Sequence, residues 1–238
     1  IAFSNSQYYD NKLLTFPSPD DLAAKVTLVP IEGYYDKGKS RQNQAEAQAV
    51  VDEIVRRLSD PELRNQSIGV VTFSSVQQTL IEDMLSDVVL QNAELENLAF
   101  NREEPVFIKN LENVQGDERD VILFSVGYGP DVNGRVSLNF GPLNRDGGER
   151  RLNVAVSRAR YEMKVFSTLR ADQIDLKKTS SIGVAGLKYF LEYAGKGTGV
   201  LNHSYAAVSE EVEMGELIAA ALREKGHQVK TKIRSEER

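Results

Sequence analysis

Hydrophobic and polar positions along the chain follow two spacings, one typical of amphipathic helices and the other of buried strands. Residues 43–58 carry apolar side chains every three or four positions, which predicts a helix with one buried face. Residues 68–73 form an almost unbroken apolar run of the length of a buried strand. Further strands are expected at residues 26–30, 106–109, 121–126 and 164–168, and further helices at residues 75–85 and 149–160.

The order of these elements indicates the fold class. Strands and helices alternate along the chain, and the run at 121–126 is apolar on both of its faces, as in the central strand of a parallel sheet. Such alternation is typical of a parallel sheet covered by helices on both faces. The sequence therefore predicts an α/β fold, with ligand sites at the carboxyl ends of the strands.

The pattern changes near residue 178, and it divides the chain into three parts. Residues 1–178 hold the alternating strands and helices. Residues 179–204 are rich in Gly and Ser around one short apolar segment, which we interpret as a linker with a short helix. Residues 205–238 combine an amphipathic helix with the start of a strand, so they predict the beginning of a further α/β domain.

Composition narrows the range of functions. The 238 residues include 41% hydrophobic and 27% charged residues, and the sequence has no apolar stretch of membrane-spanning length, so we expect a cytoplasmic protein without membrane contact. Cysteine is absent, which excludes disulfides and thiolate metal sites, and 2 histidines are too few for a zinc site. The net charge of −6 argues against a protein that coats nucleic acid through bulk electrostatics. Because the chain starts at Ile1 without an initiator Met, we expect it to be part of a longer protein.

Basic residues gather in and around the helix expected at 149–160. They are Arg145, Arg150, Arg151, Arg158, Arg160 and Lys164. Only Asp146, Glu149 and Glu162 oppose them in this segment. A locally basic helix on an acidic domain suits a phosphate-binding site, and a solvated helix face is the alternative interpretation.

Helical geometry would arrange these arginines around an apolar stripe that docks on the sheet. The stripe consists of Leu152, Ala155, Val156 and Ala159. Arg151 and Arg158 are seven residues apart, so they would project within about 20° of each other at the edge of that stripe. Arg150 and Arg160 would face solvent. Planar guanidinium groups suit phosphate, but pairing with acidic residues of the same domain is equally compatible with the spacing.

A polar loop at residues 110–120 separates two expected strands, in a place where α/β sheets bind ligands. Gly116 in this loop allows a backbone conformation or a close approach that other residues resist. The acidic residues Asp117, Glu118 and Asp120 of the same loop also fit a metal cluster, which is an alternative interpretation.

Three segments of the chain, in the correct order, resemble the late motifs of superfamily 1 helicases. Residues 68–73 and the glutamine pair that follows are similar to the segment that opens the second RecA-like domain of these enzymes. Residues 114–122, VQGDERDVI, resemble motif V, Q-G-x-E-x-D. Residues 151–160, RLNVAVSRAR, resemble motif VI, L-N-V-A-x-[ST]-R-A. The likeness covers about residues 1–175 and points to the branch that includes RNA-surveillance helicases.

The segment FGPLNRDGG at residues 140–148 is also similar to large bacterial helicases that carry a C-terminal nuclease-like domain. The resemblance implies that residues 1–178 form a second RecA-like domain and that residues 205–238 begin an endonuclease-like one. It requires only one of the acidic residues of the loop, so we expect no metal site in this part of the protein.

The resemblance implies nucleotide contacts for five residues. It makes Arg158 the arginine finger, which reaches the γ-phosphate of ATP bound mainly by the preceding domain. It brings the backbone of Gly116 to the same phosphate, and Glu118 accepts a hydrogen bond from the ribose. Gln115 couples the phosphate site to the strand-binding surface. Arg151 supports the helix or the phosphate pocket.

The resemblance also implies contacts with single-stranded DNA or RNA through Thr72, Ser74 and Asn113, whose short polar side chains suit the sugar-phosphate backbone. The chain lacks a G-x-x-x-x-G-K-[ST] loop and a recognisable Asp-Glu box for magnesium. ATP and Mg²⁺ are therefore expected mainly on the first RecA-like domain of the same protein, and this part alone is expected to be inactive. A non-catalytic nucleic-acid-binding or regulatory module and the recruiting part of a nuclease are the alternatives.

Overall fold

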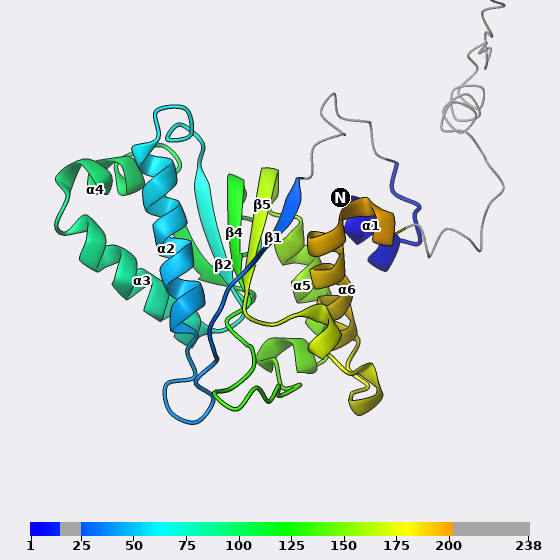
Figure 1. Ribbon diagram of the computed structural model, residues 1–238. Helices are drawn as coiled ribbons and strands as arrows, with labels where there is room; N and C mark the ends of the chain where they lie inside the picture. The colour runs from blue at the N-terminus through cyan, green and yellow to red at the C-terminus, as the bar shows by residue number, and fades with distance from the viewer. Residues whose placement is uncertain (15–24, 202–238) are drawn as a thin grey trace, which may run out of the picture. The chain divides into compact units, whose positions relative to one another are not determined.

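The computed structural model describes residues 1–14 and 25–201, and its centre is a parallel β-sheet of five strands (Figure 1). The strands are β1 Val26–Pro30, β2 Ile68–Thr72, β3 Phe107–Asn110, β4 Arg119–Ser125 and β5 Ala159–Ser167. Their order across the sheet is β1-β5-β4-β2-β3, and every neighbouring pair is parallel. The five strands expected from the sequence are therefore confirmed.

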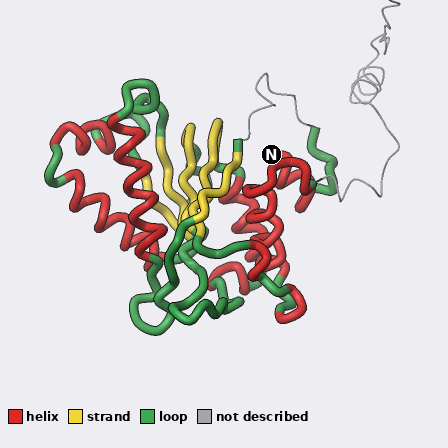
Figure 2. The backbone as a smooth tube through the Cα atoms, viewed as in Figure 1, coloured by secondary structure: helices red, strands yellow, loops and turns green. Residues whose placement is uncertain are grey.

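Helices cover both faces of this sheet (Figures 1 and 2). The helices are α1 Ala2–Tyr8, α2 Gln44–Ser59, α3 Ser75–Val89, α4 Ala93–Phe100, α5 Gly148–Val156 and α6 Ile182–Lys196. Short 3-10 turns are η1 Gly141–Asn144, η2 Ala171–Gln173, η3 Leu176–Lys178 and η4 Gly197–Val200. One face carries α2, α3 and α4, and the other carries α1, α5 and α6. The predicted α/β class, a parallel sheet with helices on both faces, is confirmed.

The central strand β4 shows why its sequence is apolar throughout. Val121 and Leu123 are buried in the core under α2, α3 and α4, whereas Ile122 and Phe124 are buried in the core under α5 and α6. Because successive side chains of a strand point to opposite faces, a strand covered on both sides needs no polar positions.

Among the described residues, no helix has the length and apolar character that crossing a membrane requires.

The helix expected at 149–160 is shorter than the sequence pattern suggests. Helix α5 ends at Val156, and Ala159 already pairs with Arg119 as the first residue of β5. Ala and Arg are strong helix formers, so local propensity favours continuing the helix. The hydrogen-bonded ladder to β4 overrides that preference and draws these residues into the sheet. Arg158 thus lies in the connection between helix and strand, and the prediction that it shares a helix with Arg151 is wrong.

The helix within residues 179–204, by contrast, is longer than the short one expected from the sequence. Helix α6 has 15 residues, and Val184, Leu187, Phe190 and Leu191 are buried against the sheet. Its apolar side is made partly by Gly and Ala, which a count of large hydrophobic residues misses. Residues 182–201 therefore belong to the packed body of the protein rather than to a linker. The helix and strand expected between residues 205 and 238 lie outside the described residues.

At the carboxyl ends of β4 and β5, one fully buried carboxylate joins several elements. Glu46, in the first turn of α2, accepts hydrogen bonds from the N–H groups of Thr168 at 2.7 Å and Gly127 at 2.6 Å. It also accepts from the Ser125 hydroxyl at 3.0 Å and the Asn43 amide at 3.1 Å. Burial raises the pKa of Glu46 to about 7, although these hydrogen bonds act in the opposite direction. This end of the sheet is thus closed by a structural network.

The raised pKa of Glu46 gives a prediction for stability against pH. Below about pH 4.5 the carboxyl is protonated in both the folded and unfolded states, and between pH 4.5 and about 7 the unfolded chain releases its proton first. The free energy of unfolding of the wild type should therefore fall with rising pH across this window, relative to that of Glu46→Gln, which does not titrate. Urea denaturation of both proteins at several pH values measures the difference. A difference that does not change with pH would contradict the prediction.

Helices α5 and α6 approach η1 too closely for side chains at two positions. A Cβ added at Gly148 or at Gly183 would overlap the backbone carbonyl of Leu143. The Ser181 hydroxyl donates a hydrogen bond of 2.9 Å to the same carbonyl, which fixes the start of α6 beside it. These contacts hold α5, and with it the connection that carries Arg158, in place against the sheet.

We expect Gly183→Ala to lower the free energy of unfolding by roughly 1–3 kcal/mol, because backbone must move to relieve the overlap. Gly195→Ala in the same helix is the matched control, since its Cβ would make an ordinary contact of 3.4 Å with the Leu28 side chain. Helix propensity alone should leave this control unchanged or up to about 1 kcal/mol more stable. Chemical denaturation distinguishes the two outcomes, and equal stabilities for both variants would refute the close approach.

Candidate functional site

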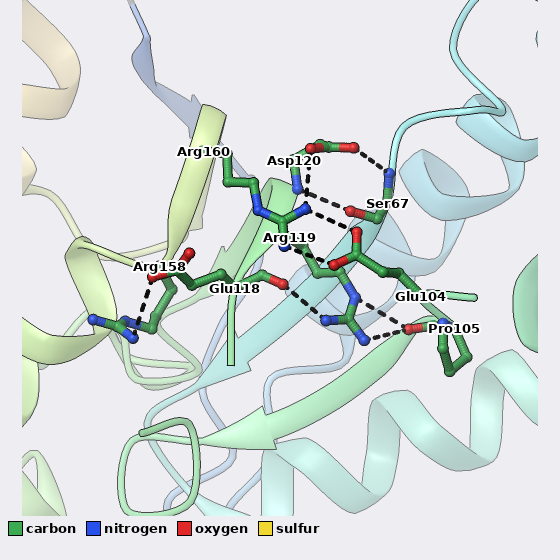
Figure 3. A network of polar contacts seen from close by, with 8 residues as sticks. All are labelled: Ser67, Glu104, Pro105, Glu118, Arg119, Asp120, Arg158 and Arg160. Carbon is green, nitrogen blue, oxygen red and sulfur yellow. Dashed lines mark hydrogen bonds and ion pairs between the residues drawn. The ribbon is translucent and has the colours of Figure 1, made fainter. Parts of the chain in front are cut away.

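The candidate nucleotide-contacting residues Glu118 and Arg158 meet at the amino ends of β4 and β5 (Figure 3). Glu118 directly precedes β4, and Arg158 directly precedes β5. The two strands are neighbours, and the N–H of Arg119 donates to the carbonyl of Arg158 at 3.3 Å. The pair is therefore created by strand pairing between distant segments. The expectation that ligand sites lie at carboxyl ends is wrong for these two residues, because each stands before its strand.

The Arg158 guanidinium is held mainly by its own segment. Its Nε donates to the carbonyl of Val154 at 2.8 Å, and one Nη donates to the Ser157 hydroxyl at 3.0 Å. The other Nη lies 3.9 Å from a carboxylate oxygen of Glu118. The side chain of Glu118 is 54% exposed, whereas that of Arg158 is 18% exposed. An ion pair of this length with an exposed carboxylate contributes little to stability, so the guanidinium is aimed by the helix end and only loosely paired.

Arg151 lies apart from this pair. It is at the start of α5 and donates to the carbonyl of Asp146 at 3.0 Å, whereas Arg158 is bonded to the end of the same helix. Arg151 thereby fastens the turn that precedes α5. Both roles that the resemblance gives to Arg151 stay predictions.

Arg160 occupies a strongly paired position beside the candidate site. Its guanidinium donates to both carboxylate oxygens of Glu104, at 2.6 and 2.8 Å, and it lies 3.4 Å from Asp120. The Arg160 guanidinium lowers the pKa of Glu104 to about 2. Asp120 in turn accepts from the N–H of Ser67 at 2.9 Å. Arg160 is exposed, as expected, with 39% of its side chain accessible, but β5 also brings it to acidic partners on neighbouring segments that the sequence did not predict.

Arg119 fixes the backbone next to the candidate site. One Nη donates to the carbonyl of Glu118 at 2.8 Å, and the other donates to the carbonyl of Pro105 at 2.9 Å. The guanidinium also lies 4.8 Å from the centre of the Phe107 ring. Neither Arg119 nor Glu104 is among the site residues expected from the sequence. Arg119 stands inside the motif V resemblance, which is a usable signal, whereas nothing in the sequence pattern marks Glu104.

The loop between β3 and β4 runs from the carboxyl end of one strand to the amino end of the other, so it crosses the sheet face that α5 and α6 cover. Leu111 and Val114 anchor the loop in the core. Gln115 and Gly116 are exposed, and Gly116 has a φ of 90°, a conformation that L side chains rarely adopt. Apart from its two chain neighbours, no residue lies within 4 Å of the position of a Cβ at Gly116, which leaves room for a ligand beside its backbone.

The three carboxylates of this loop have separate partners. Asp117 pairs with Lys109 at 2.7 Å, Asp120 binds Ser67 and Arg160, and Glu118 faces Arg158. Across residues 1–14 and 25–201, no group of three or more acidic, His or Cys side chains could hold a metal ion. The alternative interpretation of these residues as a metal cluster therefore finds no geometric support.

The residues expected to contact nucleic acid differ in accessibility. Thr72, at the end of β2, is fully buried, and its hydroxyl donates to the carbonyl of Ser74 at 2.9 Å. Ser74 is partly exposed, and its hydroxyl caps α3 by accepting from the N–H of Gln77 at 3.2 Å. Asn113 is exposed in the loop after β3. In this conformation Ser74 and Asn113 reach the surface, whereas the side chain of Thr72 does not.

Comparison with known proteins adds information on the family. A family model described as AAA domain matches residues 1–170. The uncharacterized ATP-dependent helicase MG140 of Mycoplasma genitalium is 37% identical over 201 residues, which are 81% of this chain and 17% of that protein. Its homolog in Mycoplasma pneumoniae is 36% identical over 201 residues, with the same coverage of 81% and 17%. The chain thus spans about a sixth of the length of these curated relatives.

A solved structure of the C-terminal domain of a possible DNA helicase from Lactobacillus plantarum is 14% identical to this chain. The two structures align with a TM-score of 0.37, over 70% of this chain and 81% of the Lactobacillus chain. The match to the family model extends over residues 1–170 of 238 and includes β1 to β5, α5 and the Glu118–Arg158 pair. The chain belongs to the family described as AAA domain.

Proposed function

We propose that this chain is the second motor domain of an ATP-dependent superfamily 1 helicase or translocase that acts on single-stranded DNA or RNA. The observation that carries the proposal is the setting of Arg158, whose guanidinium is fixed by Val154 and Ser157 while its remaining Nη has only a long contact with Glu118. A cation that is aimed but weakly paired is available to a phosphate presented by a neighbouring domain. Likeness to two ATP-dependent helicases supports the same activity.

In this proposal Arg158 is the arginine finger. Its positive charge stabilises the charge that develops on the γ-phosphate during phosphoryl transfer, an effect that is worth about 10³–10⁵ in rate in other nucleotide hydrolases. ATP and Mg²⁺ are held mainly by the first RecA-like domain of the full-length protein. Gly116 offers its backbone to the same phosphate, and the exposed Glu118 carboxylate accepts from the ribose once Arg158 has turned to the phosphate.

The loop from Leu111 to Glu118 is the proposed link between ATP and nucleic acid. Its first part, with Asn113, lies near the carboxyl edge of the sheet, and its last residue lies beside Arg158 at the amino edge. Gln115 stands between the two ends, which suits the coupling role proposed for it. A shift of this loop on closure around ATP would therefore move the strand-binding groups as well.

In the full-length protein, Arg158→Ala should reduce the ATPase rate by roughly 10³-fold or more while nucleotide affinity changes little, because the finger acts chiefly in the transition state. Arg150→Ala is the matched control, since the Arg150 side chain is 89% exposed and its ion pair with the neighbouring Glu149 is long, at 3.7 Å. Phosphate release under saturating ATP and binding of a fluorescent nucleotide measure the two effects. An unchanged rate of ATP hydrolysis by Arg158→Ala would contradict the proposed role of Arg158 as the arginine finger.

The isolated chain should bind ATP weakly and hydrolyse none, because the proposed phosphate loop and magnesium ligands belong to the other motor domain. Phosphate release by the purified chain, with and without single-stranded nucleic acid, tests this expectation. The full-length protein serves as the positive control. Turnover by the chain alone would mean that it holds a complete ATPase site of its own.

A further inference from the structure

An apolar groove of about 290 Å³ lies at the β3 edge of the sheet, away from β5, the strand that Arg158 precedes. The residues that line it belong to α3, α4 and the segment of β3. Its apolar lining consists of Leu85, Val89, Leu90, Phe100, Val106 and Ile108. Leu90 is 75% exposed and Phe100 is 44% exposed, so two large hydrophobic residues of the lining are accessible to solvent. Exposed apolar patches of this kind are frequent at sites of protein–protein contact.

The charged residues that line the groove are both acidic. Glu82 and Glu96 line it directly, and both are exposed. No Lys or Arg occurs between residues 65 and 101, a stretch that holds five acidic residues. The acidic residues are Glu82, Asp83, Asp87, Glu94 and Glu96. The groove therefore presents an apolar floor between carboxylates that lack a cation from their own helices.

The two basic residues that follow this stretch, Arg102 and Lys109, are engaged elsewhere. Arg102 donates hydrogen bonds of 2.9 Å to the carbonyls of Arg64 and Asn65. Lys109 pairs with Asp117 at 2.7 Å, and it follows Ile108, so it points to the opposite face of β3. The negative potential around the groove thus has no internal compensation from these residues.

We propose that this groove docks an amphipathic helix of a partner protein that carries apolar anchors flanked by Lys or Arg. An apolar helix face seated in a hydrophobic groove is a recurring form of peptide recognition, and basic flanking residues would meet Glu82 and Glu96. A second copy of this chain fits poorly, because two acidic rims would face each other on a chain of net charge −6. The docking site is independent of the motor function proposed above.

The test uses the full chain and a designed helical peptide with Leu at positions i, i+4 and i+7 and Lys beside them. Titration followed by NMR of methyl groups should shift Leu85, Val89, Leu90 and Ile108 first. A peptide with Glu in place of every Lys should bind at least about tenfold more weakly, since like charges would then be opposed. High salt should weaken binding of the basic peptide.

Two pairs of variants locate the contact. Glu82→Lys combined with Glu96→Lys should weaken the basic peptide at least about tenfold and strengthen the acidic one, whereas Glu112→Lys, outside the groove, should change neither. Leu90→Ser should weaken both peptides, and Val132→Ser is its matched control because Val132 is also strongly exposed, at 71%. Circular dichroism checks that each variant is folded.

Several results would overturn the proposal. Absence of shifts up to millimolar basic peptide, shifts centred on other parts of the chain, or equal binding of the acidic peptide would each do so. If the groove methyl groups shift with protein concentration in the absence of peptide, the groove binds a second copy of this chain rather than a partner helix.

Discussion

The pairing of β4 with β5 is the constraint on which the candidate site depends. It sets Arg119 opposite Ala159 and thereby places the residues before each strand, Glu118 and Arg158, side by side. These two residues are 40 positions apart in the sequence, and no local element could bring them together. Both β4 and β5 are interior strands of the sheet with a neighbour on each side, and their register is fixed by the alternation of side chains into the two cores. A site built on such strands is held more rigidly than one built on loops alone.

The two ends of the sheet use charge differently. At the carboxyl end, Glu46 is fully buried and accepts hydrogen bonds from Ser125, Gly127 and Thr168, so removing one of these elements would leave buried polar groups without partners. At the amino end, arginines and carboxylates are partly exposed and can exchange partners at a lower cost in desolvation. The first network stabilises the fold, and the second is suited to a changing ligand.

The sequence was informative where periodicity decides the structure. The strand Ile68–Thr72 and the helix Gln44–Ser59 are predicted by the spacing of apolar residues. Burial of these residues in the core stabilises each element, so the spacing matches the observed structure. The end of α5 could not be predicted, since Ala159 and Arg160 favour a helix and only the ladder to β4 makes them a strand. The partner of Arg160 was equally hidden, because Glu104 lies 56 residues away and meets it only after the sheet has formed.

Within one short segment, Arg158 and Arg160 show how pairing separates a structural arginine from one available to a ligand. Arg160 is held by a bidentate pair with Glu104 and by Asp120, so presenting it to a phosphate would break short charge-assisted hydrogen bonds. Arg158 has a carbonyl and a hydroxyl as its close partners, and its one carboxylate contact is 3.9 Å long. Neutral partners orient a guanidinium without neutralising it. The charge at Arg158 therefore remains free to act on an incoming anion, whereas the charge at Arg160 is already matched inside the fold.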